Sequence, residues 1–143
     1  MGFLDSLLKG EEEKTEDYGR SSGMPFKISL GFLPLRLAAM KDNKVNLTVR
    51  LTNTSGEPQL VSVDATLPRG PLLGFDPTCI HKTTEKKLGN LRPNETIEVV
   101  LPVWANNQTK EGNYPIEVTA YSHYLDYTKV INSMKKSISL RVV

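Results

Sequence analysis

"LRPNETIEVVLPVWANNQTKEGNYPIEVTAYS", residues 91–122, contains two runs of alternating apolar and polar side chains joined by a polar turn. Every second residue in each run is apolar: Ile97, Val99, Leu101 and Val103 in the first, and Tyr114, Ile116, Val118 and Ala120 in the second. Successive side chains of a strand point to opposite faces, so this alternation indicates half-buried strands. The stretch therefore predicts two antiparallel strands of an all-β core, with Trp104 on the opposite face.

The same two-residue period recurs along the rest of the chain. It is clear in "KVNLTVRLTN", "QLVSVDATLP" and "SISLRV", and shorter in "FKISLGF" and "EKKLGNL". Turns rich in Asn, Gly, Pro and Ser separate these runs, and Pro102 favours an edge position or a bulge because proline cannot donate to the ladder. About seven such strands predict a single immunoglobulin-like antiparallel β-sandwich over residues 24–143.

The first 23 residues have a different texture. Residues 1–10, "MGFLDSLLKG", carry an apolar stripe at helical spacing and predict a short amphipathic helix; the stripe consists of Phe3, Leu4, Leu7 and Leu8. Residues 11–23 are acidic and then rich in Gly and Ser, which predicts a flexible linker. A helix of about ten residues is not stable alone in water, so the stripe must bury against a partner, a membrane surface or the body of the domain.

Charge and cysteine content limit the functional classes. The 143-residue chain has a formal net charge of +2, too small to predict nucleic-acid binding. Residues 1–23 hold three basic and six acidic side chains, so an acidic segment precedes a mildly basic body. Cys79 is the only cysteine, which excludes an internal disulfide. With no recognisable leader, these features predict a cytoplasmic protein, free or peripheral at the membrane, or an extracellular one if a leader precedes this sequence.

Four Asn-x-Ser/Thr sequons are the feature that favours an extracellular location. They begin at Asn46, Asn53, Asn94 and Asn107. Strands and turns rich in Thr and Asn generate such triplets by composition, and the sequons are unused without a secretory route.

Four stretches carry a family resemblance. "NLTVRLTNTSGEP", "LGNLRPNETIEVVLPVWA", "EGNYPIEVTAYS" and "SISLRVV" are similar to archaeal and bacterial immunoglobulin-like modules of the CARDB type. The resemblance covers roughly residues 26–143, and its motifs encode turns and core positions, so it implies a fold and no activity. More distantly, the pattern resembles the sandwiches of arrestin-like adaptors, which usually carry two such domains.

Catalytic and metal-binding patterns are weak in this sequence. Cys79 and His81 stand two residues apart, but His123 is the only other histidine and a zinc site needs three or four ligands. The sequence has no P-loop, no G-x-S-x-G and no G-x-G-x-x-G. We therefore predict no metal, no cofactor and no enzymatic activity, and we interpret Cys79 as a small buried residue beside an exposed histidine.

The tyrosine-rich stretch "YSHYLDYTKV" is the strongest surface candidate on the body. Tyr121, Tyr124 and Tyr127 could pad the end of the sandwich or form a contact surface for a protein or a carbohydrate. The preferred interpretation is a non-catalytic interaction or scaffold module that binds a protein or itself, partly through the N-terminal stripe. A membrane surface is a weaker target for that stripe. The alternative is an accessory domain that binds carbohydrate or another ligand.

Overall fold

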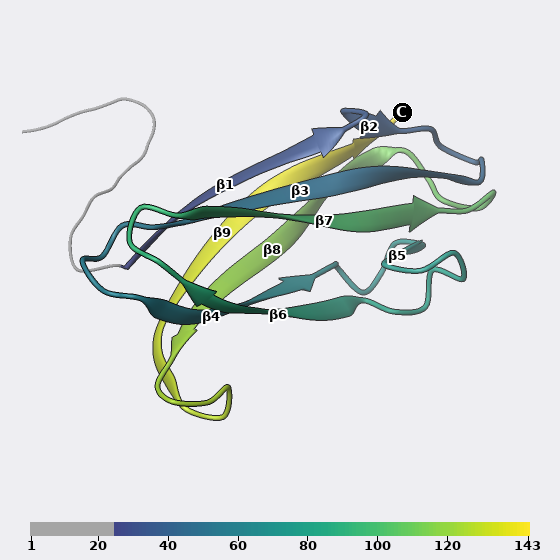
Figure 1. Cartoon of the computed structure of the whole chain (residues 1–143). Helices are drawn as coiled ribbons and strands as arrows, with labels where there is room; N and C mark the ends of the chain where they lie inside the picture. Colours follow the sequence, from purple (N-terminus) through teal and green to yellow (C-terminus); the bar gives the residue numbers. More distant parts are fainter. Residues whose placement is uncertain (1–24) are drawn as a thin grey trace, which may run out of the picture.

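Nine β-strands make up the part of the chain that the computed structural model describes, residues 25–143 (Figure 1). They are β1 (Phe26–Leu33), β2 (Arg36–Leu37), β3 (Asn43–Asn53), β4 (Gln59–Thr66), β5 (Leu73–Gly74), β6 (Thr83–Leu91), β7 (Thr96–Ala105), β8 (Gly112–His123) and β9 (Val130–Val142). The prediction of about seven strands is low by two, because β2 and β5 have only two residues each and show no alternation. Within these residues no helix is long and apolar enough to span a membrane.

The strands form two sheets that face each other (Figure 1). One has the order β1-β3-β7-β5 and the other β2-β9-β8-β4-β6. Neighbouring strands are antiparallel except for β2, which runs parallel to the end of β9. The chain passes from one sheet to the other between β1 and β2, through the cis Leu33–Pro34 peptide bond. This arrangement is an immunoglobulin-like sandwich, as the alternation predicted.

The core follows the alternating pattern closely. Its fully buried side chains include Val45, Leu47, Val49 and Leu51 of β3, Val61, Val63 and Ala65 of β4, and Ile116, Val118 and Ala120 of β8. Ile97 and Val99, expected in the core, are only partly buried against it. Strand β7 pairs with β3 along its length but meets β5 only at Trp104 and Ala105. Ile97 and Val99 therefore lie on the part of β7 that has an open edge. Pro102 lies on this strand, as expected for a proline at an edge.

A buried asparagine joins the two sheets at one end of the sandwich. Asn53 is fully buried, and its Nδ2 donates hydrogen bonds to the carbonyl oxygens of Glu57 and Leu91, both at 2.8 Å. Its backbone carbonyl accepts from the Asn94 amide at 2.8 Å, which ties the β6–β7 turn to the end of β3. Because both hydrogens of its side-chain amide are engaged, the sequon at Asn53 is inaccessible in the folded domain.

Tyr114 closes the turn before β8. Its hydroxyl donates to the Lys110 carbonyl oxygen at 2.8 Å, four residues earlier in the chain. Gly112 has a φ of +156°, and a Cβ placed there would meet the Tyr114 ring at 3.2 Å. This tyrosine corner is a recurring device of immunoglobulin-like sandwiches, so "G-N-Y-P-I-E-V" encodes a turn and not a binding site.

Candidate functional site

The loop between β8 and β9, residues 124–129, projects from the lower end of the molecule in Figure 1. The Tyr124 amide donates to the Lys129 carbonyl oxygen at 2.9 Å, and the Asp126 amide donates to the Tyr124 carbonyl oxygen at 2.8 Å. Thr128 donates to Asp126 Oδ1 through its amide at 2.9 Å and through its hydroxyl. These bonds from Thr128 lower the pKa of the Asp126 carboxyl. The loop is therefore fixed by its own hydrogen bonds, as in an Asx turn.

Tyr127 attaches this loop to the outer face of the sheet. Its hydroxyl accepts a 2.8 Å hydrogen bond from the Gly89 amide of β6. The ring makes an edge contact with His123, with centroids 5.1 Å apart, and the Lys87 Nζ lies 5.3 Å from the ring centroid. Tyr127 is thus held by a backbone donor, an imidazole and a cation, so its hydroxyl and its ring are already engaged within the domain.

A polar cluster lies beside Tyr127, on the outer face of β4 and β8. The Ser62 hydroxyl and His123 Nε2 are 2.7 Å apart, and the Tyr121 ring lies 6.1 Å from the His123 ring. Burial, reinforced by Glu85, raises the pKa of the Asp64 carboxyl. Burial and the nearby Asp64 also raise the pKa of the Tyr121 hydroxyl. Ser62 lies on the outward face of β4, and the imidazole bonded to it helps to bury it.

The Ser62–His123 pair has the contact distance of a nucleophile and its base, so its access decides its role. Ser62 is 1% exposed and His123 is 7% exposed, so a substrate carbonyl could not reach the hydroxyl. His123 Nδ1, which an orienting carboxylate would have to bind, has no hydrogen-bond partner. In this closed arrangement the pair packs the sheet face and is not set up for acyl transfer.

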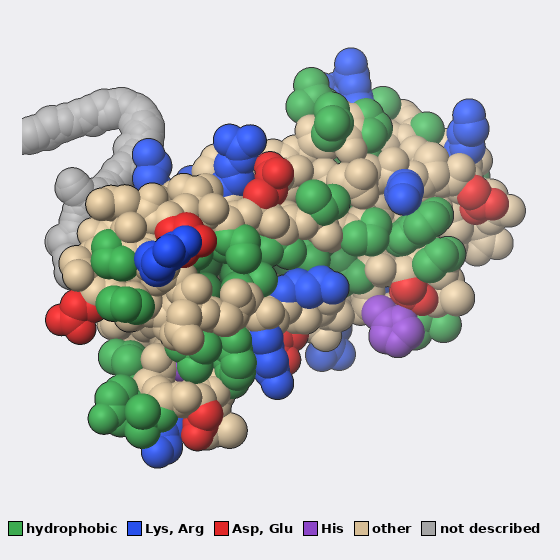
Figure 2. Space-filling view, viewed as in Figure 1, with side chains coloured by type: hydrophobic (Ala, Val, Ile, Leu, Met, Phe, Trp, Pro, Cys, Tyr) green, Lys and Arg blue, Asp and Glu red, His purple; other side chains and the backbone are tan. Residues whose placement is uncertain are grey.

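The outer end of the hairpin, in contrast, exposes large apolar side chains. This apolar tip consists of Tyr124, Leu125, Val130 and Ile131, which are 59%, 75%, 55% and 54% exposed. Ile131 is exposed because the register shifts there: Ser122 pairs with Asn132 and His123 with Val130, so Ile131 has no opposite residue. Figure 2 shows hydrophobic side chains gathered at this lower tip beside a basic one. The apolar tip is the strongest candidate for a contact surface.

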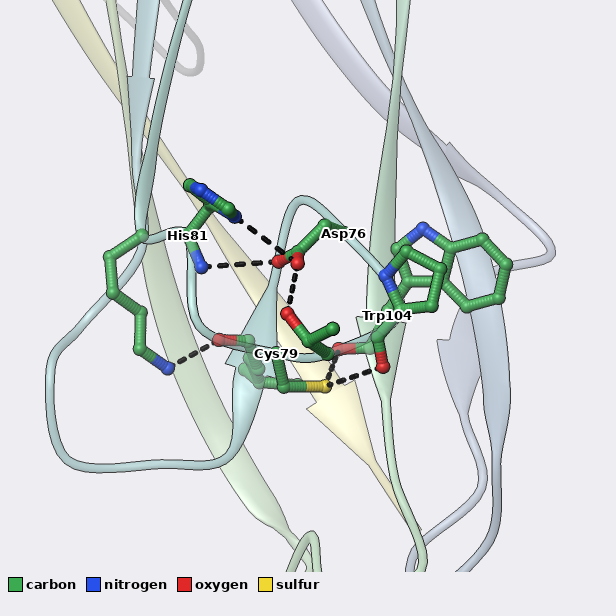
Figure 3. Close-up of polar contacts among 8 residues, drawn as sticks. Asp76, Cys79, His81 and Trp104 are labelled. Carbon is green, nitrogen blue, oxygen red and sulfur yellow. Dashed lines mark hydrogen bonds and ion pairs between the residues drawn. The ribbon is translucent and has the colours of Figure 1, made fainter.

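A second polar cluster occupies residues 75–82, between β5 and β6 (Figure 3). Asp76 accepts hydrogen bonds from the Thr78 hydroxyl and the His81 amide, and His81 Nδ1 lies 3.1 Å from Asp76 Oδ2. The bond from Thr78, followed by those from His81, holds the pKa of the Asp76 carboxyl well below its usual range. Among residues 25–143 no group of three or more His, Cys, Asp or Glu side chains could hold a metal ion. The cluster closes a loop.

Cys79 lies beneath this cluster with its sulfur directed at the backbone of β7 (Figure 3). It is 4% exposed, and its Sγ is 3.4 Å from the Trp104 carbonyl oxygen. Burial raises the pKa of its thiol, so the reactive thiolate is disfavoured. The His81 side chain is 72% exposed and turns away from the sulfur. The interpretation of Cys79 as a buried residue beside an exposed histidine is confirmed.

The residues that the sequence predicts as contact sites lie in different surroundings in the structure. Tyr121 and Tyr127 are partly buried around His123, whereas Tyr124 is exposed, so the three rings do not form one platform. Trp104 is half-buried at the far end of β7, with Lys44 Nζ 5.2 Å from its ring centroid. The N-terminal stripe lies outside the described residues; it comprises Phe3, Leu4, Leu7 and Leu8. The sequence did not identify Leu125, Val130 and Ile131 as contact residues, because apolar alternation along a strand gives no information about residues in a loop or a bulge.

The fold is shared with domains of bacterial alpha-2-macroglobulins. An Escherichia coli alpha-2-macroglobulin structure from domain MG7 to the C-terminus superposes with a TM-score of 0.61 at 21% identity, over 83% of this chain and 16% of that chain. A mutant Salmonella alpha-2-macroglobulin gives 0.57 at 20% identity, over 83% and 7% of the two chains. AvmM, which catalyses macrocyclization in alchivemycin A biosynthesis, gives 0.50 at 9% identity, over 82% and 88%.

These similarities establish the fold class alone. The chain spans only 16% of the first of these structures. What the whole alpha-2-macroglobulin does therefore does not carry over to this chain. No protein-family profile and no curated protein sequence matches the chain. The class that the fold defines is an immunoglobulin-like β-sandwich, and such sandwiches host many unrelated functions.

Proposed function

We propose that this protein is a non-catalytic protein-interaction module whose body binds its partner through the apolar tip. The observation that carries the proposal is the exposure of four large apolar side chains at the end of a loop that its own hydrogen bonds and Tyr127 hold in place. Contiguous exposed apolar surface of this kind marks interaction sites in soluble domains. Aromatic and aliphatic anchors at the centre of an interface contribute most of its binding energy.

The backbone of the tip supports the same proposal. Leu125 has a φ of +70°, in the left-handed region that bulky side chains rarely adopt. Such a conformation costs about 1–2 kcal/mol for a residue with a Cβ. Because the side chain is 75% exposed, packing within the domain does not offset this cost. A pocket on a partner would do so. Met40 also combines a positive φ, +57°, with a 62% exposed side chain, so the backbone supports the tip only together with its four exposed apolar side chains.

The proposal also includes a non-catalytic role, a cytoplasmic location and a preference for protein over carbohydrate. The polar clusters around His123 and Asp76 are closed by internal bonds, which favours binding over catalysis. The CARDB-type resemblance and a cytoplasmic location, peripheral or not, fit a scaffold of this kind. Carbohydrate binding is the weaker alternative, because Tyr121 and Tyr127 are engaged around His123 and only Tyr124 offers an exposed ring.

Quantitative capture from native lysate tests the proposal. Leu125→Ser should reduce the capture of one or more identified proteins at least tenfold while the melting temperature changes little. Leu35→Ser is the matched control, because Leu35 is 76% exposed and precedes β2, which pairs with the end of β9 remote from the tip. Equal losses from the two variants, or no loss from Leu125→Ser, would show that the apolar tip is not the binding surface.

A further inference from the structure

We infer that the apolar tip is also the docking site for residues 3–8 of the same chain, so that the N-terminal segment competes with an outside partner. This inference rests on the proposed function of the tip as a binding surface. It assigns an occupant to the apolar stripe, whose residues are Phe3, Leu4, Leu7 and Leu8. It also makes access to the tip dependent on displacement of that segment.

The described chain begins at the same end of the sandwich as the tip. The Thr54 amide donates to the Pro25 carbonyl oxygen at 2.8 Å, which places the start of β1 beside the β3–β4 loop. Strand β4 begins after that loop, and its Leu60 pairs with His123, the residue immediately before the tip. The two facing sheets are about 10 Å apart, and a loop that extends about three residues beyond His123 adds roughly 10 Å, so residue 25 and the tip are separated by roughly 20 Å.

The length of the preceding chain suits that span. Thirteen residues, 11–23, separate the stripe segment from the body. A flexible chain of that length has a root-mean-square end-to-end distance of about 20 Å. When linker length and span match, the effective local concentration is largest, of the order of millimolar for short flexible linkers. The tip is therefore within the range where a weakly binding segment of the same chain is favoured over one from another molecule.

A second exposed apolar group lies much farther from residue 25, where the described chain begins. Leu33, Leu35 and Met40 are 73%, 76% and 62% exposed. They lie at or beyond the far end of β1, whose eight residues extend about 27 Å. The effective concentration of a tethered segment falls as the span exceeds the length of the linker, so the tip is the preferred acceptor although both groups are apolar.

Charge also favours the tip. Residues 11–17 hold five acidic side chains and one basic side chain. Near residue 25 and the tip the body carries Lys27, Lys87 and Lys129. Of the acidic side chains at this end, Glu95 is paired with Arg92 and Asp126 is bonded by Thr128, which leaves Glu57 against the three lysines. An acidic segment that runs from residue 25 to the tip would pass these cations, and this attraction weakens as salt is added.

A spin-label experiment on the full chain tests the docking directly. Ser6→Cys provides a site for a nitroxide, since the native Cys79 is 4% exposed and its sulfur is in contact with the β7 backbone. In the ¹⁵N-labelled protein we expect the amide signals of residues 124–131 to broaden strongly, and those of Leu33, Leu35 and Met40 to be unaffected. Adding Leu4→Asp and Leu8→Asp to the labelled chain keeps the tether and removes the apolar contact, so broadening at the tip should fall several-fold.

Three results would overturn the inference. They are broadening that is unchanged by the two Asp substitutions, broadening centred on Leu33 and Met40, and broadening in a mixture of spin-labelled chains with separate ¹⁵N-labelled chains, which would identify a second copy as the occupant. Partner capture separates the two proposals. If docking occurs, the Leu4→Asp, Leu8→Asp chain should capture partner about two- to tenfold better, because the competing state is removed. Loss of capture in Leu125→Ser without docking would leave the proposed function standing alone.

Discussion

Two loops of this domain share a local design and differ in what they do with it. Residues 75–82 and residues 124–129 each contain an aspartate that accepts a hydrogen bond from the threonine two positions later: Asp76 from Thr78 and Asp126 from Thr128. Each also contains a non-glycine residue with a left-handed backbone, Cys79 with a φ of 59° and Leu125 with a φ of 70°.

The difference lies in the side chain of the strained residue. Cys79 is 4% exposed and packs between Gly74 and the backbone of β7, so the fold itself explains its conformation. Leu125 is 75% exposed: the Asp126 amide bond to the Tyr124 carbonyl oxygen holds its backbone, but its side chain is not buried against the domain. The first loop is therefore a structural closure, whereas the second holds a strained backbone whose side chain gains no packing within the domain.

The largest expected effect comes from disturbing the closed loop at its tightest point. A Cβ added at Gly74 would meet the Cys79 Cα at 2.4 Å and the Cys79 carbonyl carbon at 2.7 Å, both backbone atoms. Gly74→Ala should therefore lower the free energy of unfolding by about 3 kcal/mol or more. Urea denaturation measures the change.

Gly31→Ala is the control for that substitution, because a Cβ at Gly31 meets nothing within 4 Å. Its free energy of unfolding should stay the same or rise by up to about 1 kcal/mol, since alanine restricts the unfolded chain. If Gly74→Ala were as harmless as Gly31→Ala, residues 75–82 would be able to move away, and the contrast between a rigid closure and a presenting loop would be lost.

The next effect concerns the anchor of the presenting loop. Tyr127→Phe keeps the ring between Lys87 and His123 but leaves the Gly89 amide without its acceptor. The expected loss in the free energy of unfolding is about 1–2 kcal/mol. Tyr124→Phe, at a 59% exposed position, should change it by less than about 0.5 kcal/mol. Similar values for the two variants would mean that the loop is not held by the Tyr127 hydroxyl.

A smaller effect distinguishes the two aspartates by pH. The hydrogen bonds from Thr78 and His81 lower the pKa of Asp76 below its value of 3.8 in an unfolded chain. The stability that these bonds confer is therefore present above about pH 4 and lost as the pH falls through and below that value. The melting temperature of Asp76→Asn should fall less between pH 4 and pH 2 than that of the wild type.

Asp126→Asn should flatten the same profile to a smaller extent, because Asp76 has the His81 amide and imidazole beside it in addition to the bond from its threonine. A larger flattening from Asp126→Asn would reverse the assignment of the more strongly bonded loop.

The sequence predicted most of the strands and their buried faces, but only part of the candidate site. Alternation identified the buried faces of β3, β4 and β8, because a two-residue period reports directly which side of a strand faces the core. It failed at Ile97 and Val99, where burial depends on whether another strand covers the edge of β7. That is a property of sheet order, which the alternation within one strand does not contain.

The tyrosine stretch is a second case in which contacts with residues distant in the sequence decide the outcome. The sequence correctly marked "YSHYLDYTKV" as unusual, but the separate roles of its tyrosines depend on distant partners. Tyr127 is bonded to Gly89, 38 positions away, and the His123 beside it is bonded to Ser62, 61 positions away. The strain at Leu125 is likewise invisible in the sequence, because a leucine between Tyr124 and Asp126 gives no sign of a left-handed backbone.

The smallest effect on stability is the one that best separates the two loops. Leu125→Gly removes the backbone cost of about 1–2 kcal/mol, but glycine also loses about 0.5–1 kcal/mol more conformational entropy on folding. Since the leucine side chain is 75% exposed, little packing is lost, and the free energy of unfolding should change by no more than about 1 kcal/mol. Cys79→Gly relieves the same kind of backbone but empties a buried position, so it should be clearly destabilising. Urea titrations of both variants provide the comparison.

A loss of more than about 2 kcal/mol in Leu125→Gly would mean that the side chain packs against the domain in solution. The apolar tip would then be part of the core and not a binding surface.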